Sequence, residues 1–347
     1  MSDHTAIEWT DATWNPLRGC SEVSPGCANC YAAGVAARFA GEGQPYEGLA
    51  QFDANGKAHW TGRIKLVEKA LSQPLRWQRP RRVFVNSMGD LFHEDVSFHY
   101  IAKVFAVMAL AKQHTFQLLT KRPRRMADWF RWIAAKWPDL GLNSAADSDS
   151  NLVLQFLDDA DAGRQVSSDD FAPPWPLPNV WLGVSAEDQS RAEERIPALL
   201  ATPAAVRFVS AEPLLGPIDL KSQISNPKSQ IDWVIVGGES GPHARSCHPQ
   251  WVRDLRDQCF AAGAAFFFKQ WGEWSECAKT DGGVYMLSSD RPVKVVSADG
   301  ASFDYRSNWD GRDGAVAMER RGKRSAGRLL DGREWSEFPG TVRAASC

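Results

Sequence analysis

Short apolar runs alternate with amphipathic stretches along most of the chain, and this alternation constrains the fold more than any other feature. The apolar runs predict strands at residues 82–86, 115–119, 179–184, 206–210, 233–236 and 265–269, with an earlier strand within 7–17. Helices are expected between them, at residues 30–40, 66–73, 98–112, 124–136, 189–200 and 249–262. Strands that are apolar on both faces and alternate with helices are typical of a parallel sheet. We therefore expect an α/β fold, a partial or complete (β/α) barrel with parallel strands and peripheral insertions.

Two stretches interrupt the alternation and suggest how the chain is divided. Residues 137–178 carry eight Asp against one Arg and end in PPWPLP, which indicates an acidic surface insertion. Residues 277–318 are rich in Gly, Asp and Ser, and a basic segment follows at 320–333. The predicted organisation is a barrel over 1–275 that includes the insertion, followed by a C-terminal appendage over 276–347.

The charge balance limits the partners that this chain can attract. The 40 Lys and Arg residues against 42 Asp and Glu residues give a formal net charge of −2 at pH 7. No global positive field draws the protein to nucleic acid or anionic lipid, so a polyanion would have to be held by a local patch. The apolar stretch at 104–111 is far too short to span a bilayer, and the first residues lack the pattern of a secretion signal. We expect a cytoplasmic protein with no membrane partner.

Polar residues follow the predicted strands at their carboxyl ends. Asp90 lies just beyond the strand at 82–86, and Lys121 follows the strand at 115–119. Two later strands run into the same three letters, SAE, which place Ser185 with Glu187 and Ser210 with Glu212. In α/β barrels the reactive site lies where the carboxyl ends of the strands converge, so these residues are candidates for it. The alternative is the ordinary polarity of surface loops.

A cysteine cluster near the N-terminus is the main indication of chemistry. Cys20, Cys27 and Cys30 form a C-x6-C-x2-C pattern, which favours metal ligation in a reducing compartment over a disulfide framework. Three thiolates on one loop can hold three irons of a 4Fe-4S cluster and leave the fourth iron open. A structural zinc site would require a fourth ligand, and no Cys or His lies nearby downstream. The spacing of Cys247, Cys259 and Cys277 disfavours a second cluster, and Cys259 is expected in the core.

These residues carry a resemblance to known proteins. The run TWNPLRGCSEVSPGCANCYA is similar to the N-P-x-R-G-C-x3-C-x2-C-Y-A signature of radical S-adenosylmethionine (SAM) enzymes related to spore photoproduct lyase, with three extra residues between the first two cysteines. The chain more widely resembles a phage-associated family of Gp-type proteins of unknown function that is placed near the radical SAM group. The matching segments are 19–32, 85–94, 118–123, 181–189, 208–218, 234–241, 243–259, 266–274 and 326–335.

The resemblance implies cofactors and roles for the candidate residues. It implies a 4Fe-4S cluster on the three cysteines and SAM bound beside it. Asp90, in the segment that corresponds to the end of the second strand, would hold the SAM amino group. Ser185 with Glu187 and Ser210 with Glu212 would bind ribose hydroxyls. Lys121 would supply positive charge for the SAM carboxylate or an anionic substrate, together with Arg122 and Lys269.

The chain departs from the usual radical SAM pattern at two places. The first two cysteines are separated by six residues instead of three, and Asn29 stands before the last cysteine where an aromatic residue is usual. Gly237, Gly238 and Glu239 end a late strand, so the role that a Gly-Gly-Glu motif has in those enzymes is not transferred to them.

The expected function is a radical SAM enzyme that cleaves SAM reductively, with an external electron donor. Its substrate is unknown, and a nucleic acid or nucleotide is the candidate class. The alternative is a non-catalytic, zinc-stabilised nucleic-acid-binding module, in which the same cysteines hold zinc. A third possibility is a phage-encoded partner protein that has kept the barrel and lost turnover.

Overall fold

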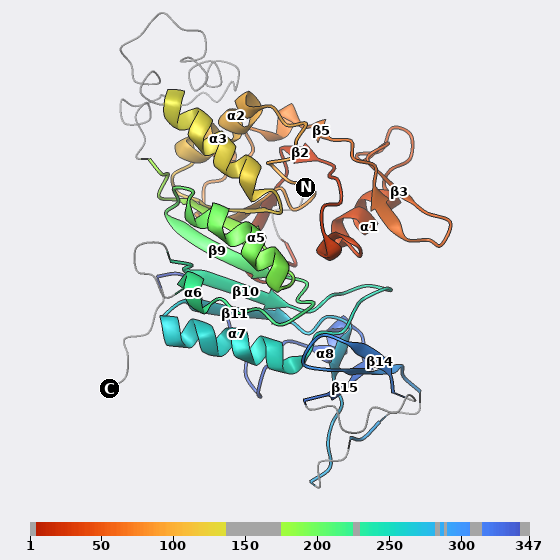
Figure 1. Ribbon diagram of the computed structural model, residues 1–347. Helices are drawn as coiled ribbons and strands as arrows, with labels where there is room; N and C mark the ends of the chain where they lie inside the picture. The colour runs from red at the N-terminus through yellow and green to blue at the C-terminus, as the bar shows by residue number, and fades with distance from the viewer. Residues whose placement is uncertain are drawn as a thin grey trace, which may run out of the picture. The chain divides into compact units, whose positions relative to one another are not determined.

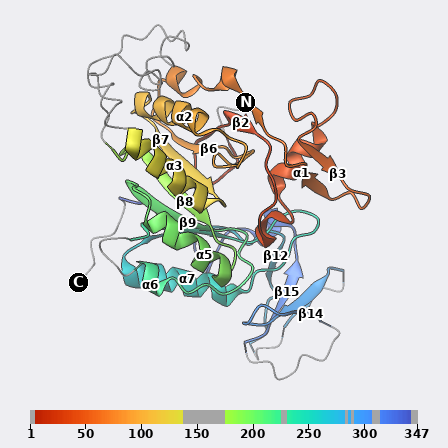
Figure 2. The same cartoon turned by 45° about the horizontal axis from the view of Figure 1, so that its top comes forward.

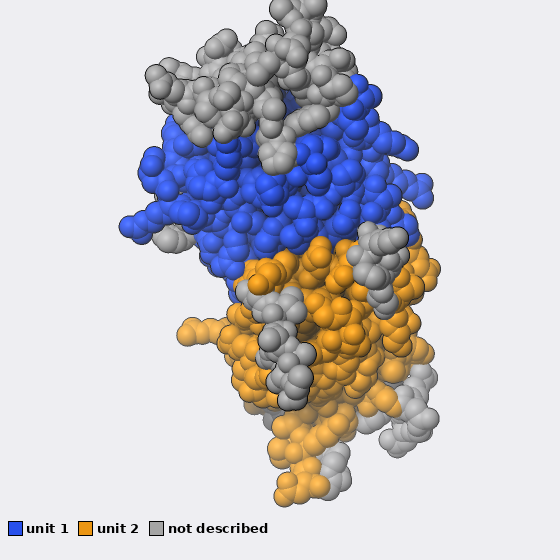
Figure 3. All heavy atoms as spheres, turned by 90° about the vertical axis from the view of Figure 1, so that its left-hand side faces the viewer, with its two compact units in different colours: residues 1–23, 32–184, 197–207 blue, residues 24–31, 185–196, 208–347 orange. Residues whose placement is uncertain are grey.

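The computed structural model describes residues 5–136, 175–224, 230–281, 285–287, 290–305 and 314–340. Most of the predicted acidic insertion, residues 137–174, lies outside these ranges. The chain forms two compact units, coloured separately in Figure 3. Unit 1 comprises residues 1–23, 32–184 and 197–207, and unit 2 comprises 24–31, 185–196 and 208–347. The predicted division at residue 275 stays a prediction.

The principal sheet consists of seven strands, all at positions that the sequence indicated. They are β1 (Ala12–Trp14), β6 (Arg82–Val85), β7 (Thr115–Thr120), β8 (Val180–Ser185), β9 (Val206–Ala211), β10 (Trp233–Gly237) and β11 (Ala265–Gln270), in the order β1-β6-β7-β8-β9-β10-β11. The pairs β1·β6, β6·β7, β7·β8, β9·β10 and β10·β11 are parallel. The α/β class with parallel strands is therefore confirmed, and the arrangement is consistent with a partial (β/α) barrel.

Unit 1 packs two long helices together. α2 (Phe98–Leu110) follows β6, and α3 (Pro123–Lys136) follows β7. The Ser97 side chain caps α2 by accepting a hydrogen bond from the backbone of Tyr100. Phe105 of α2 meets Trp129 of α3 with ring centroids 4.2 Å apart, and Figure 2 shows the two helices side by side. The remaining strands of unit 1 form two small ribbons, β2 (Leu17–Arg18) with β5 (Lys65–Leu66) and β3 (Ala50–Phe52) with β4 (Ala58–Trp60).

One predicted helix is wrong. Residues 66–73 form no α-helix. The structure has one short 3-10 helix within this range, η2 (Glu68–Ala70), and another directly after it, η3 (Pro74–Arg76). The carbonyl of Ala70 accepts a hydrogen bond from the buried Trp14 indole at 2.7 Å. The same carbonyl accepts from the Gln73 N–H at 3.2 Å, as in a 3-10 turn, and Pro74 has no N–H with which to continue an α-helix from it.

Unit 2 contains the cysteine turn, the last strands of the principal sheet and a second sheet (Figure 1). The cysteine turn spans residues 24–31 and contains the 3-10 helix η1 (Pro25–Cys27). Its last residue is the first of α1 (Tyr31–Arg38), whose other residues belong to unit 1. α7 (Pro249–Ala262) packs on β10 and β11 and ends at Gly263, whose φ of 71° suits glycine. The second sheet is antiparallel, in the order β12 (Trp274–Glu276), β15 (Val316–Arg320), β13 (Val293–Val296) and β14 (Ser302–Asp304). The other helices are α5 (Gln189–Leu200), shared between the units, α6 (Lys221–Ile224) and α8 (Lys323–Ala326).

Within the described ranges, every helix is too short or too polar to cross a bilayer.

Candidate functional site

The cysteines fall into two groups that differ in burial. Cys20, Cys27 and Cys30 are partly exposed, whereas Cys247, Cys259 and Cys277 are buried, and none of these six described cysteines forms a disulfide. Burial raises the pKa of Cys247 and Cys259 far above the ordinary value, and burial with nearby Glu319 raises the pKa of Cys277 to about 11. Thiols in such surroundings stay protonated and unreactive. The expected core position of Cys259 is confirmed, and the accessible thiols of the described chain are those of the N-terminal loop.

Two glycines bring the Cys20 segment against the loop that follows β6. Gly19 pairs with Gly89 in a parallel bridge, and the Gly19 N–H donates to the Met88 carbonyl at 3.1 Å. Gly19 has a φ of 93°, and a Cβ added there would lie 2.2 Å from the carbonyl oxygen of Arg63. Only glycine fits this conformation and spacing. The backbone thereby holds Cys20 near Asp90.

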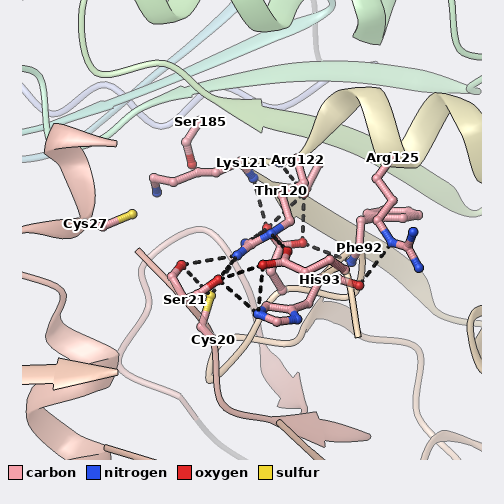
Figure 4. Close-up of polar contacts among 12 residues, drawn as sticks. Cys20, Ser21, Cys27, Phe92, His93, Thr120, Lys121, Arg122, Arg125 and Ser185 are labelled. Atoms are coloured by element: carbon pink, nitrogen blue, oxygen red, sulfur yellow. Dashed lines mark hydrogen bonds and ion pairs between the residues drawn. The ribbon is translucent and has the colours of Figure 1, made fainter. Parts of the chain in front are cut away.

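The guanidinium of Arg122 is the centre of the polar contacts around Cys20, as Figure 4 shows. Arg122 lies between β7 and α3, and its side chain is 8% exposed. Each of its N–H groups has an acceptor: Glu94 Oε2 at 2.9 Å from Nε, Asp90 Oδ2 at 3.1 Å and Cys20 Sγ at 3.7 Å from Nη1, and Ser21 O at 3.2 Å and Ser21 Oγ at 2.6 Å from Nη2. Burial alone would lower the pKa of Arg122, but Asp90, Cys20 and Glu94 raise it above its usual value. The Arg122 guanidinium therefore stays positively charged over the whole physiological pH range.

Asp90 is held by donors from two segments of unit 1, its own loop and residues 120–122. Its two oxygens accept from the Thr120 hydroxyl at 2.8 and 3.0 Å, from the backbone N–H of Phe92 at 3.0 Å and from that of Lys121 at 3.1 Å, as well as from Arg122. These donors satisfy the acceptor capacity of one carboxylate. Asp90 therefore orients Arg122 in this structure, and its contact with the SAM amino group stays a prediction.

Ser21 and His93 form a pair whose hydrogen bonds argue against a serine nucleophile. The Asp95 N–H donates to His93 Nδ1 at 3.2 Å, so the imidazole hydrogen is on Nε2, 3.0 Å from Ser21 Oγ. Burial and the charge of Arg122 lower the pKa of His93, which favours this neutral form. The Ser21 hydroxyl then donates to Glu94 Oε1 at 3.2 Å. A nucleophilic serine would instead give its proton to the histidine. These residues therefore position the loop beside Cys20.

In unit 2 a buried carboxylate fixes the turn that carries Cys27 and Cys30. The backbone N–H of Gly26 donates to Glu187 Oε1 at 3.0 Å, and the other oxygen of Glu187 accepts from Arg195 Nη1 at 3.0 Å. The side chains of Glu187 and Arg195 are 0% and 2% exposed. A Cβ on residue 26 would lie 3.0 Å from the Glu187 carboxyl carbon, so the absence of a side chain permits this approach.

A second carboxylate, Glu239, holds the other side of the same turn. Glu239 Oε2 accepts from the Asn29 amide at 2.9 Å and from Arg245 Nε at 2.9 Å. Arg245 also donates from Nη2 to the carbonyl of Pro25 at 2.9 Å. Within the turn, the Cys30 N–H donates to the Cys27 carbonyl at 3.2 Å. The backbone of both cysteines is therefore fixed by charged groups that lie far along the sequence, and the thiols remain partly exposed.

The predicted site residues divide between the two units. Asp90, Lys121 and Cys20 belong to unit 1, whereas Ser185, Glu187, Ser210, Glu212, Cys27 and Cys30 belong to unit 2. The Ser185 carbonyl accepts from Arg195 at 2.8 Å, and the Ser210 carbonyl accepts from the Ala186 N–H at 3.0 Å. Glu212 forms a partly buried ion pair with Lys269 at 2.6 Å. Among the described residues, no three His, Cys, Asp or Glu side chains are grouped as a metal site would require. The ribose and carboxylate roles of these residues stay predictions.

Several residues of the site were not identified from the sequence. Ser21, Arg195 and Arg245 carry no motif that marks them, because each acts through a contact with a distant segment. Asn29 stands in the cysteine motif and Glu239 in the Gly-Gly-Glu run after a buried strand, but the contact between them was not predicted.

The fold and the cysteine loop define the class of protein: a parallel α/β protein with three accessible thiols on an N-terminal loop. The chain belongs to the family described as protein of unknown function (DUF5131), whose model matches residues 4–339. Searches of the curated proteins and of the solved structures found no match. The family description carries no activity and no source, so the phage association and the radical SAM relationship stay predictions.

Proposed function

We propose that this protein is a radical SAM enzyme in which Cys20, Cys27 and Cys30 hold a 4Fe-4S cluster. The observation that carries the proposal is the contrast between the two groups of cysteines. The three thiols of the C-x6-C-x2-C loop are partly exposed and form no disulfide, while Cys247, Cys259 and Cys277 are buried with raised pKa values. Thiolate ligands need to lose their protons and reach the cluster, and burial opposes both for the second group, whereas the loop group is accessible.

The donor set suits this cofactor in ligand type and number, although the described side chains are not grouped as a bound cluster would require. Three cysteine thiolates are the ligand type and number that a cluster with one open iron takes from its protein. When bound, such a cluster supplies the electron for reductive cleavage of SAM, and an external donor must supply that electron in turn. The radical SAM type of the barrel is part of the same proposal.

The chain's own residues hold and surround the thiols. Glu187 and Glu239 fix the backbone of the Cys27 and Cys30 turn. Little further ordering of that backbone is therefore needed when the two cysteines bind the cluster. Arg122 donates to the sulfur of Cys20, and Asp90 and Glu94 orient it. In metal sites, groups that hydrogen-bond to the ligands orient the ligand atoms toward the metal.

Polar groups at strand ends would bind SAM. Ser185 and Ser210 end their strands with hydroxyl groups, and Glu212 with Lys269 offers a carboxylate and an ammonium at the ends of β9 and β11. Lys121 is proposed for the SAM carboxylate. The substrate class remains a nucleotide or nucleic acid, and the exposed Lys323 and Arg324 of α8 are proposed to contact its phosphates.

Metal loading of matched cysteine variants tests the proposal. The wild-type protein, Cys27→Ala and Cys259→Ala are purified without oxygen, reconstituted with iron and sulfide, and assayed for bound iron and sulfide. We expect the wild-type protein and Cys259→Ala to bind about four irons per chain, as one 4Fe-4S cluster requires, and Cys27→Ala to bind almost none while remaining folded by circular dichroism.

Three outcomes would count against the proposal. Full iron in Cys27→Ala would contradict the ligand assignment. About one zinc and no iron in the wild-type protein would favour the non-catalytic module. With a loaded cluster, SAM and a strong reductant should yield 5′-deoxyadenosine, and its absence would contradict the catalytic part.

A further inference from the structure

We infer that Arg122 raises the reduction potential of the cluster by donating a hydrogen bond to the sulfur of Cys20. This inference rests on the proposed function, because it concerns one of the three proposed ligands. It assigns a role to a residue that does not itself bind the cluster, and it concerns only contacts within unit 1.

The geometry shows why Arg122 is suited to this role. Four of its N–H groups donate to oxygen, on Asp90, Glu94 and Ser21, and the remaining one donates to Cys20 Sγ at 3.7 Å. A guanidinium is a rigid planar fork, so the four oxygen acceptors fix the direction of the fifth donor. The sulfur contact is therefore held by the rest of the network and does not depend on the rotamer of a free side chain.

The burial of Arg122 makes the contact electrostatically effective. The side chains of Arg122 and Asp90 are both 8% exposed, so water screens the guanidinium poorly. Reduction adds one negative charge to the cluster, which is shared with the ligand sulfurs. A buried cation that donates to one of these sulfurs stabilises the reduced form, and hydrogen bonds to sulfur are one of the means by which a protein sets the potential.

Arg125, in the first turn of α3, provides a matched control. It donates to the backbone carbonyls of His93 at 3.1 Å and Val96 at 2.6 Å, and it lies over the ring of Phe98. Both acceptors are oxygens of the β6–α2 connection. Replacing it removes a guanidinium three positions away and leaves the sulfur contact in place.

The test is a redox titration of reconstituted protein, followed by electron paramagnetic resonance, on wild-type, Arg122→Gln, Arg122→Lys and Arg125→Gln. Iron and sulfide are measured first. We expect Arg122→Gln to lower the ratio of reduced to oxidised cluster at fixed ambient potential about tenfold, equal to about 59 mV for a one-electron couple. Arg122→Lys keeps the charge but not the fork, so its shift should be smaller and of the same sign. Arg125→Gln should leave the potential unchanged.

The outcomes separate this inference from the proposed function. A wild-type protein without iron overturns the proposed function and never reaches the titration. Loaded Arg122→Gln with the wild-type potential, or with a shift equal to that of Arg125→Gln, overturns the inference alone. If Arg122→Gln fails to fold, because Asp90 then lacks its partner, Arg122→Lys decides: an unchanged or raised potential overturns the inference.

Discussion

The two parts of the cysteine loop are held by charged groups in opposite ways. Beside Cys20, a cation contacts the sulfur directly, and the carboxylates of Asp90 and Glu94 act on that cation. Around Cys27 and Cys30, carboxylates contact the loop itself, through the Gly26 N–H and the Asn29 amide. The same kinds of residue therefore adjust the electronics of a sulfur at one place and the position of a backbone at the other.

The difference in role predicts a difference in what substitutions change. Removing a buried anchor of the Cys27 turn should mainly cost stability, because it leaves a charge or an N–H group without a partner in a dry environment. Removing a group near Cys20 should mainly change the properties of the sulfur, because the loop there is also held by the backbone bridge between Gly19 and Gly89.

The largest expected effect is that of Glu187→Ala. The substitution leaves the fully buried Arg195 without its carboxylate and the Gly26 N–H without its acceptor. We expect a loss of about 3 kcal/mol in the free energy of unfolding, measured by urea denaturation. Glu187→Gln keeps an acceptor for Gly26 but not the charge that Arg195 pairs with, so its loss should be smaller than that of Glu187→Ala. An unchanged midpoint in Glu187→Ala would contradict the anchoring role.

A smaller effect, with a control of opposite sign, is expected at two glycines of the same region. A Cβ at Gly26 would lie 3.0 Å from the carboxyl carbon of Glu187, which Arg195 holds in place, whereas nothing lies within 4 Å of a Cβ at Gly34 in α1. Gly26→Ala should destabilise the protein by about 1 kcal/mol and reduce iron loading. Gly34→Ala should stabilise it by up to about 1 kcal/mol, because alanine favours the helix. Equal shifts in melting temperature would refute the packing argument.

The smallest effect is a dependence on pH near Cys20. Burial raises the pKa of Glu94, but its own backbone N–H and Arg122 outweigh this and lower the pKa from 4.5 to about 2. The ionised form is thus favoured in the folded state, so its contribution to stability is present above the ordinary pKa of about 4.5 and is lost as the pH falls towards about 2.

Comparison of the wild-type protein with Glu94→Gln measures this contribution. The Glu94 side chain is 59% exposed, so we expect the variant to be less stable by no more than about 1 kcal/mol near neutral pH. The difference should shrink as the pH is lowered from about 4.5 to about 2, in urea melts at a series of pH values. A difference that grows in acid would show that Glu94 is stabilised in its protonated form.

Much of the fold could be predicted from local pattern. The helix expected at 189–200 is α5 (Gln189–Leu200), the one expected at 249–262 is α7 (Pro249–Ala262), and the strands agree to within a residue or two at their ends. These elements combine a clear apolar pattern with local start or stop signals such as Gly263. At 66–73 the chain turns as a 3-10 helix instead, because Pro74 has no N–H to extend an α-helix from the Ala70 carbonyl, which accepts from Gln73 and from the distant Trp14 indole.

The candidate site was predicted only in part, because the hydrogen-bond partners of its residues lie far along the sequence. Residue type and spacing identified the cysteine loop, since ligand atoms on one loop must be close in sequence. They also selected Glu187 and Asp90 as important carboxylates, but the partners found for them in the structure are the Gly26 N–H and Arg122. A single sequence shows that a carboxylate follows a strand and does not show which donor it meets.

The sequence by itself determined the strands, most of the helices and the choice of the three cysteines, because periodicity and ligand spacing are properties of neighbouring residues. Only the tertiary structure decided which thiols are buried, which carboxylates fix the Cys27 turn and which cation contacts Cys20. Those contacts join residues that are tens to hundreds of positions apart, such as Gly26 with Glu187 and Cys20 with Arg122. Their energies depend on burial and direction, and both arise only once the chain has folded.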